Sequence, residues 1–203
     1  MMILKICLMI LMKAVMISIK PKWCELIAEG KKTIEVRKTK PKIETPFKCY
    51  IYCTNTKPYL VWGDVFKGDW ETEFTHLSGY NRKDAEKIWD VFNGKVIGEF
   101  VCDGIEDFSQ WEYEYDTLLR HINLYAGTNG DYKFLSHYLN GQKKGYAWHI
   151  SDLVVYDKPK ELNDFHAPCD SRCDGMCFEG VECCRIITRP PQSWCYVEEL
   201  KGE

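Results

Sequence analysis

The sequence predicts an α+β fold, a small mixed β-barrel with short helices around it and a cysteine-rich insertion. Its apolar fraction of 45% is sufficient for a packed core, and its seven Trp and twelve Tyr favour β structure. Several short segments alternate between apolar and polar residues, as strands do. Helical patterns do not follow each strand regularly, which disfavours a doubly wound parallel sheet. The length of 203 residues fits one domain with insertions.

The first three elements are the clearest. Residues 13–19 alternate, with Val15, Ile17 and Ile19 on one side, and predict a strand. Pro21 then favours the start of a short helix, which Gly30 ends as a C-cap. Residues 33–37 return to a period of two, so Ile34 and Val36 face the core while Thr33, Glu35 and Arg37 face the other way.

The remaining elements are shorter or less regular. Strands are predicted at 48–54, 95–102, 146–150, 153–156 and 193–197, and helices at 83–92, 116–124 and 132–139. We therefore expect a single domain over 12–203 with insertions at 56–94, 103–145 and 166–187. Residues 1–11 are apolar but lack a small-residue cleavage site, and they are too short to span a bilayer. We expect them to be a start-site artefact or a frayed arm, and the protein to be cytoplasmic, without a membrane partner.

The charge is unevenly distributed along the chain. The formal net charge of −3 argues against a protein that coats nucleic acid over its whole surface. Between Lys20 and Lys48, however, nine Lys or Arg residues face four Glu residues, which gives this segment a charge of +5. A local basic patch on an acidic body fits one phosphate-bearing ligand better than a long duplex. The alternative is an ordinary solvated charged face.

The run Gly30-Lys31-Lys32-Thr33-Ile34-Glu35-Val36-Arg37 resembles the signature of the ASCH family, a branch of the PUA-like superfamily. The approach from Ile17 to Trp23, the segment 94–98 and the segment 148–152 fit the same pattern. The resemblance covers roughly 12–54, 94–102 and 146–165. It implies a PUA-like β-barrel with a cleft beside the first helix that holds RNA or a modified nucleoside.

The residues themselves agree with such a cleft. We expect Lys20, Lys32, Thr33, Glu35, Arg37 and Trp148 to bind the ligand. The Arg37 guanidinium can form a fork onto a phosphate or carboxylate, and Glu35 can accept from an amino group or orient Lys32. Trp148, with Tyr50, Tyr52 and Tyr146, can stack on a base, although aromatic residues in strands are more often core.

An enzyme is the alternative to a binding module. Some small ASCH proteins with a similar motif are amidohydrolases that deacetylate N4-acetylcytidine, and the resemblance carries their catalytic Lys over to Lys32. Their catalytic Thr falls at Glu35, and their distant Glu has no counterpart that we can place. Catalysis requires a lowered pKa for Lys32, which burial or Arg37 favours and Glu35 opposes. Lys32 and Glu35 are therefore the candidate catalytic residues.

Eleven cysteines are present, and five of them lie close together at Cys169, Cys173, Cys177, Cys183 and Cys184. Without an export signal, these are more consistent with thiols or metal ligands than with disulfides. Four thiolates are enough for a structural zinc site, although the spacing is not that of a zinc ribbon, and His166 can replace one of them. An iron–sulfur cluster and plain thiols are the alternatives. A zinc-stapled module that binds a partner protein is thus a third hypothesis for function.

Overall fold

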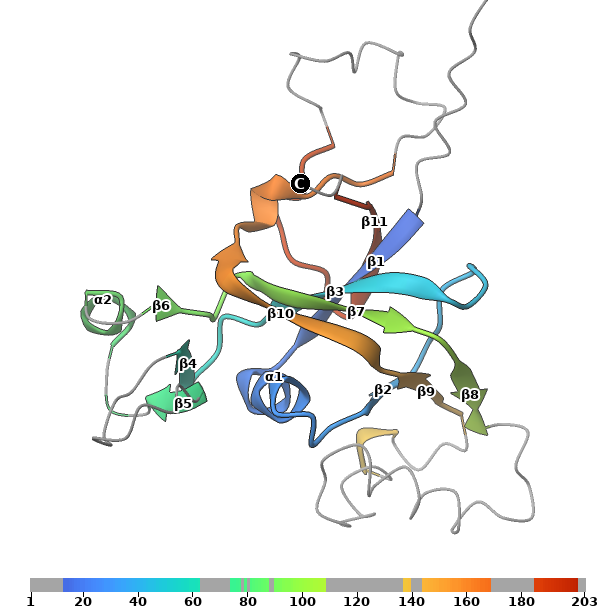
Figure 1. Cartoon of the computed structure of the whole chain (residues 1–203), viewed down its shortest axis with the longest axis horizontal. Coiled ribbons are helices and arrows are strands. Elements are labelled where there is room, and N and C mark those ends of the chain that lie inside the picture. The colour runs from blue at the N-terminus through green and yellow to red at the C-terminus, as the bar shows by residue number, and fades with distance from the viewer. Residues whose placement is uncertain are drawn as a thin grey trace, which may run out of the picture.

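The computed structural model describes residues 13–62, 74–77, 79, 81–87, 90–108, 137–139, 144–168 and 185–200. A five-stranded sheet forms the centre of this part of the chain (Figure 1). Its strands, in spatial order, are β10 (Ser151–Lys160), β7 (Val96–Cys102), β3 (Phe47–Cys53), β1 (Lys13–Ile19) and β11 (Trp194–Glu198). Strands β1 and β3 are parallel and the other pairs are antiparallel, so the predicted mixed sheet is confirmed.

Strand β1 is buried on both faces. Val15, Ile17 and Ile19 pack on one face against β3, the first helix and Trp148, as their alternation predicts. Ala14 and Met16 are buried on the opposite face, where Phe165 and Val197 from the later part of the chain cover them. A strand covered on both sides reads as a nearly continuous apolar run, which explains the composition of 14–19.

A second sheet holds the residues of the predicted motif. Its order is β2 (Ile34–Arg37), β9 (Tyr146–His149) and β8 (Ile105–Asp107), which makes β2 an edge strand. Helix α1 (Pro21–Ala28) connects β1 to β2, and Gly30, with φ of 69°, follows its end as predicted. The chain passes from β9 directly into β10, so one continuous segment joins the second sheet to the first.

The region 56–94 contains sheet that the sequence analysis missed. Strands β4 (Tyr59–Trp62), β5 (Phe74–Leu77) and β6 (Asp90–Val91) form a third sheet, and the helix predicted at 83–92 is confirmed only at its start. Helix α2 spans only Arg82–Ala85, and Val91 pairs with Val61 instead of continuing a helix. The buried Asn93 side chain accepts from the backbone N–H of Leu60 at 2.7 Å, a long-range contact that local periodicity does not reveal.

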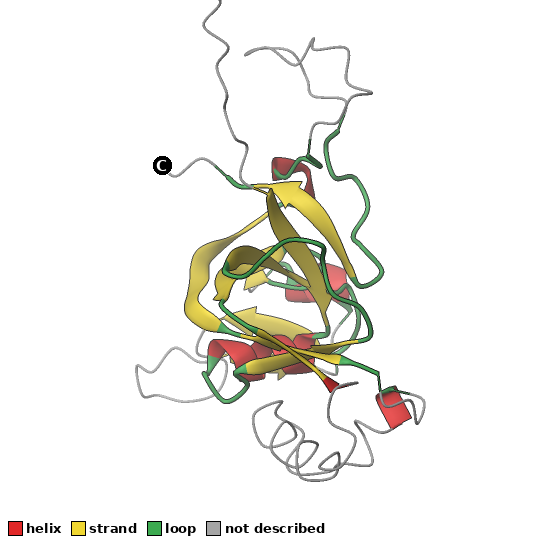
Figure 2. Cartoon of the chain, turned by 90° about the vertical axis from the view of Figure 1, so that its right-hand side faces the viewer, coloured by secondary structure: helices red, strands yellow, loops and turns green. Residues whose placement is uncertain are grey.

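The barrel prediction needs correction. In Figure 2 strongly curved strands lie in the middle of the molecule, but the strands described here form three separate sheets and no closed barrel. Strand β10 ends the main sheet on one side, and the 3₁₀ turn η2 (Leu162–Asp164) follows it. The other predicted strands agree with β3, β7, β9, β10 and β11. Residues 1–12, the predicted helix 116–124 and most of 132–139 lie outside the described residues, so the proposed insertion boundaries stay predictions.

Candidate functional site

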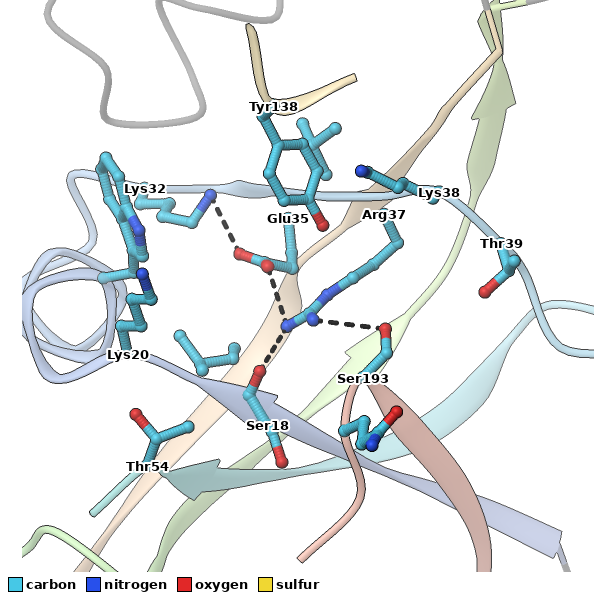
Figure 3. A pocket seen from close by; sticks show the side chains of 14 residues that line it. Ser18, Lys20, Lys32, Glu35, Arg37, Lys38, Thr39, Thr54, Tyr138 and Ser193 are labelled. Atoms are coloured by element: carbon cyan, nitrogen blue, oxygen red, sulfur yellow. Dashed lines mark hydrogen bonds and ion pairs between the residues drawn. The ribbon is translucent and has the colours of Figure 1, made fainter. Parts of the chain in front are cut away.

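A pocket of about 550 Å³ lies between the end of β1, the first turn of α1 and the edge strand β2 (Figure 3). Residues 18–20 and Trp23 form one wall, and residues 35–39 together with Lys32 form the opposite one. Thr54, Tyr138, Gln192 and Ser193 complete the lining in the described part of the chain. Small-molecule sites typically have volumes of roughly 300–1,000 Å³, so the space suits one small ligand or one unit of a polymer.

Three charged side chains form a ladder along the wall that β2 provides. Glu35 lies between two cations: its Oε2 is 3.0 Å from Lys32 Nζ, and its Oε1 is 3.0 Å from Arg37 Nη2. Lys32 Nζ also donates to the carbonyl of Ile34. The three side chains are only 4–10% exposed. Burial of charge is tolerated only where partners are supplied, and each member of this ladder has one.

Arg37 connects β2 to strand β1 and to the residue that precedes β11. Its Nη2 donates to the carbonyl of Ser18 at 2.6 Å, and its Nη1 lies 3.4 Å from Ser193 Oγ (Figure 3). The Arg37 Nε is buried and has no hydrogen-bond partner among the residues that the structure describes. The guanidinium is thus fixed across the pocket floor by contacts from three segments of the chain.

The alternation of β2 explains how one strand serves both the core and the pocket. Ile34 and Val36 pack with Phe108, Leu139 and Ala147 on one face, as predicted. Glu35 and Arg37 extend from the other face into the pocket. Among the described strands, β2 pairs with β9, and the pocket lies between β2 and the end of β1.

Burial of the Lys32 ammonium lowers its pKa, since desolvation penalises the charged form. The neighbouring Glu35 carboxylate acts in the opposite direction, and the Arg37 guanidinium adds to the lowering. The net shift is downward. The three influences are those that the sequence analysis weighed, and burial is the largest of them.

Aromatic rings and further lysines flank the ladder. The half-buried Trp23 ring lies 5.6 Å from Lys32 Nζ and 5.1 Å from Lys22 Nζ. On the other side, Lys38 Nζ lies 5.2 Å from the centre of the Tyr138 ring, and burial raises the pKa of Tyr138. Among the lining residues of the described chain, Lys20, Lys32, Arg37 and Lys38 are basic and Glu35 is acidic. The pocket therefore favours an anionic ligand.

The structure separates the predicted ligand residues into two groups. Lys20, Lys32, Glu35 and Arg37 line the pocket together. Thr33, which immediately precedes β2, is exposed and does not line the pocket, and its backbone carbonyl accepts from Ile150 N. Trp148 is fully buried, packed edge-on against Phe47 and tilted against Trp194, so it offers no free face to a base. Tyr50 and Tyr52 are core residues as well.

Several lining residues were missed by the sequence analysis. Trp23 has the helical spacing of a core residue relative to Leu26 and Ile27, yet its ring forms part of the pocket wall. Trp23 lies three residues after Lys20, which was predicted to bind the ligand, and this spacing was the sequence signal that could have placed its ring at the pocket. Gln192 and Ser193 are more than 150 residues away from β2 in the sequence, and no local pattern brings them to the pocket.

The predicted metal ligands Cys169, Cys173, Cys177, Cys183 and Cys184 lie outside the described residues, so the zinc site stays a prediction. Within the residues that are described, no group of three or more His, Cys, Asp or Glu side chains is arranged to hold a metal ion. Cys24, Cys49, Cys53 and Cys102 are buried and form no disulfide, which is typical of cysteines that pack as small core residues. None of the helices in the described part of the chain is long and apolar enough to cross a bilayer.

Comparison with known proteins identifies the family. The model of the ASCH domain matches residues 17–160. A crystal structure of ASCH from Zymomonas mobilis is 17% identical, with 92% of this chain and 88% of that chain covered at a TM-score of 0.45. A serine-to-alanine mutant of that protein is 17% identical, with 92% of this chain and 89% of that chain covered at a TM-score of 0.49. A tyrosine-to-phenylalanine mutant is 16% identical, with 92% of this chain and 91% of that chain covered at a TM-score of 0.43. A search of curated proteins found no match. On the family match, the chain belongs to the ASCH domain family, a PUA-like family associated with RNA binding.

Proposed function

We propose that this protein binds RNA, or a nucleotide or modified nucleoside derived from it, in the pocket between β1, α1 and β2. The observation that carries the proposal is the buried ladder of Lys32, Glu35 and Arg37 along one wall of a 550 Å³ pocket. Such a ladder is held in place before any ligand arrives, so little ordering is required on binding.

The chemistry of the lining fits the parts of a nucleotide. Lys20 and Lys38 are exposed at the pocket and can reach a phosphate. Trp23 supplies an aromatic wall on which a base can stack. Glu35 accepts hydrogen bonds and the guanidinium of Arg37 donates them, so both kinds of polar group on a base or sugar find partners.

Binding of a short single-stranded RNA, measured by fluorescence anisotropy, tests this proposal. We expect saturable binding by the wild-type protein and a loss of at least about tenfold in affinity for Arg37→Lys, which cannot form the planar fork. Lys48→Met removes a lysine that does not line the pocket, and it measures how much the loss of one positive charge elsewhere weakens binding. If Arg37→Lys bound RNA as tightly as the wild type while retaining its circular dichroism spectrum, the pocket would not be the RNA site.

Hydrolysis of an acylated cytidine is a second candidate function, and the lowered pKa of Lys32 favours it. A buried lysine with a lowered pKa can take a proton or act as a nucleophile more readily than an exposed one. In the simplest version, Lys32 activates water for attack on the exocyclic amide, which yields cytidine and acetate. Incubation with N4-acetylcytidine, with Lys32→Met as the control, tests this: turnover that the variant lacks supports hydrolysis, and binding without turnover supports the binding module.

A further inference from the structure

The pocket receives residues from the C-terminal part of the chain, which lies beyond the segment that matches the family. The ASCH model ends at residue 160, whereas Gln192 and Ser193 line the pocket just before β11. Ser193 is engaged by Arg37 Nη1 at 3.4 Å. Gln192 is exposed, and its side chain forms no hydrogen bond with any other residue in the described part of the chain.

The backbone on both sides of Gln192 is fixed. Ser18 Oγ donates to the carbonyl of Pro191 at 2.6 Å, and Ser18 N donates to the carbonyl of Ser193 at 2.9 Å. Pro190 and Pro191 further restrict the chain before it, because each ring locks φ. Trp194 then anchors the following position through a 3.0 Å hydrogen bond from Nε1 to Thr39 Oγ1. The Gln192 amide therefore extends from a rigid backbone.

We infer that Gln192 is a specificity-determining residue whose side-chain amide reads the hydrogen-bonding edge of the base bound in the pocket. A carboxamide carries one acceptor oxygen and two donor hydrogens side by side, which matches the adjacent donor and acceptor that a base presents along one edge. The lysines and Arg37 are donors only, whereas Gln192 can accept from a base through its oxygen and donate to it through its nitrogen. This inference rests on the proposed function.

Titration calorimetry with the 5′-monophosphates of adenosine, cytidine, guanosine and uridine tests it. We expect the wild-type protein to prefer one base at least about tenfold over the weakest, within the range that a bidentate amide contact gives. Gln192→Ala should remove this preference by weakening the preferred nucleotide about tenfold while leaving the weakest nearly unchanged. Gln192→Glu should also remove it, since the donor half of the contact is lost.

Thr188→Ala, an exposed change on the same segment that does not line the pocket, is the matched control and should keep wild-type affinities. Two results would overturn the inference alone: equal affinity of the wild type for all four nucleotides, or an unaltered preference in Gln192→Ala. If the wild-type protein bound neither these nucleotides nor RNA, the proposed function would fail, and the role of Gln192 with it.

Discussion

Two lysine–glutamate pairs in this protein have similar geometry and different surroundings. Lys32 and Glu35 are joined at 3.0 Å beside the pocket and are 4% and 10% exposed. Lys48 and Glu99 are joined at 2.8 Å across β3 and β7 and are 29% and 22% exposed. Burial lowers the pKa of Lys32, whereas the hydrogen bond to Glu99 raises the pKa of Lys48. The direction of the pKa shift is therefore set by desolvation at Lys32 and by the hydrogen bond to Glu99 at Lys48.

The more exposed pair, Lys48 and Glu99 (the outer pair), has a structural role in the sheet, in contrast to Lys32 and Glu35 (the inner pair). Glu99 also accepts from the Tyr156 hydroxyl at 2.5 Å, so its carboxylate joins side chains from β3, β7 and β10. Burial by itself would raise the pKa of Glu99, but the hydrogen bonds from Lys48 and Tyr156 bring it below its usual value. The inner pair has a different arrangement: a second cation, Arg37, shares its carboxylate, and all three groups border an open space. Charged groups that are buried beside a pocket, despite the free-energy cost of removing them from water, are candidates for function.

Removal of the shared carboxylate should have the largest effect. Glu35→Gln leaves Lys32 and Arg37 as buried cations without an anion, and we expect it to lower the free energy of unfolding by about 3–5 kcal/mol. Glu99→Gln should cost only about 1 kcal/mol or less, because water still reaches its partners. Urea denaturation at pH 7 measures both. Equal losses in the two variants would show that the inner pair is no more desolvated than the outer one.

Ligand affinity should separate the two lysines next. Lys32→Met should weaken RNA binding at least about tenfold, since a hydrogen bond from a charged group contributes about 1.5–3 kcal/mol. Lys48→Met should change the affinity less than twofold. Anisotropy with a labelled RNA, at one salt concentration for all proteins, provides the comparison. A similar loss in both variants would indicate that only overall charge attracts the RNA.

The two lysines should also give opposite pH dependences on the alkaline side. A lysine with a lowered folded-state pKa loses its proton at a lower pH in the folded protein than in the unfolded chain. Lys32 therefore contributes stability that grows as the pH rises from its folded-state pKa towards 10.5. This stability is lost as the pH falls through the folded-state pKa. Lys48, with a raised pKa, contributes stability that is present below 10.5 and lost as the pH rises through its folded pKa.

Urea denaturation of the wild type, Lys32→Met and Lys48→Met between pH 7 and 11 tests these signs. Relative to the wild type, Lys32→Met should lose the most stability at high pH, and Lys48→Met should lose the least there. Parallel curves for all three proteins would mean that neither pKa is shifted by folding.

Salt should produce the smallest difference. A double-mutant cycle on Lys48 and Glu99 should give a coupling of about 0.2–1 kcal/mol that falls towards zero in 1 M NaCl. The coupling between Lys32 and Glu35 should change much less, because buried charges are screened weakly. An equal decrease for both pairs would contradict the burial of the inner pair.

The part of this account that sequence could predict was local. The period-two pattern of 33–37 placed Glu35 and Arg37 on the face opposite Ile34 and Val36, and the structure agrees. The same motif indicated the ASCH family, which the family match confirms. Pro21 and Gly30 likewise marked the ends of α1 to within two residues.

What failed depended on contacts between distant segments. Trp148 has the pattern of any strand aromatic, and only its full burial against Phe47 and Trp194 shows that it is a core residue. The strands in 56–94 are short, and β6 exists because two residues pair with β4. The contribution of Gln192 requires β11 to lie next to β1, a pairing across almost the whole chain. None of these follows from periodicity.

The most direct test of the central claim is an NMR titration of RNA into protein labelled at the lysine side chains, with Lys32→Met and Lys48→Met used to assign the two signals. If the ladder beside the pocket is the binding surface, the Lys32 signal should shift until the site is saturated while that of Lys48 stays in place. RNA binding that leaves the Lys32 signal unchanged would contradict the account.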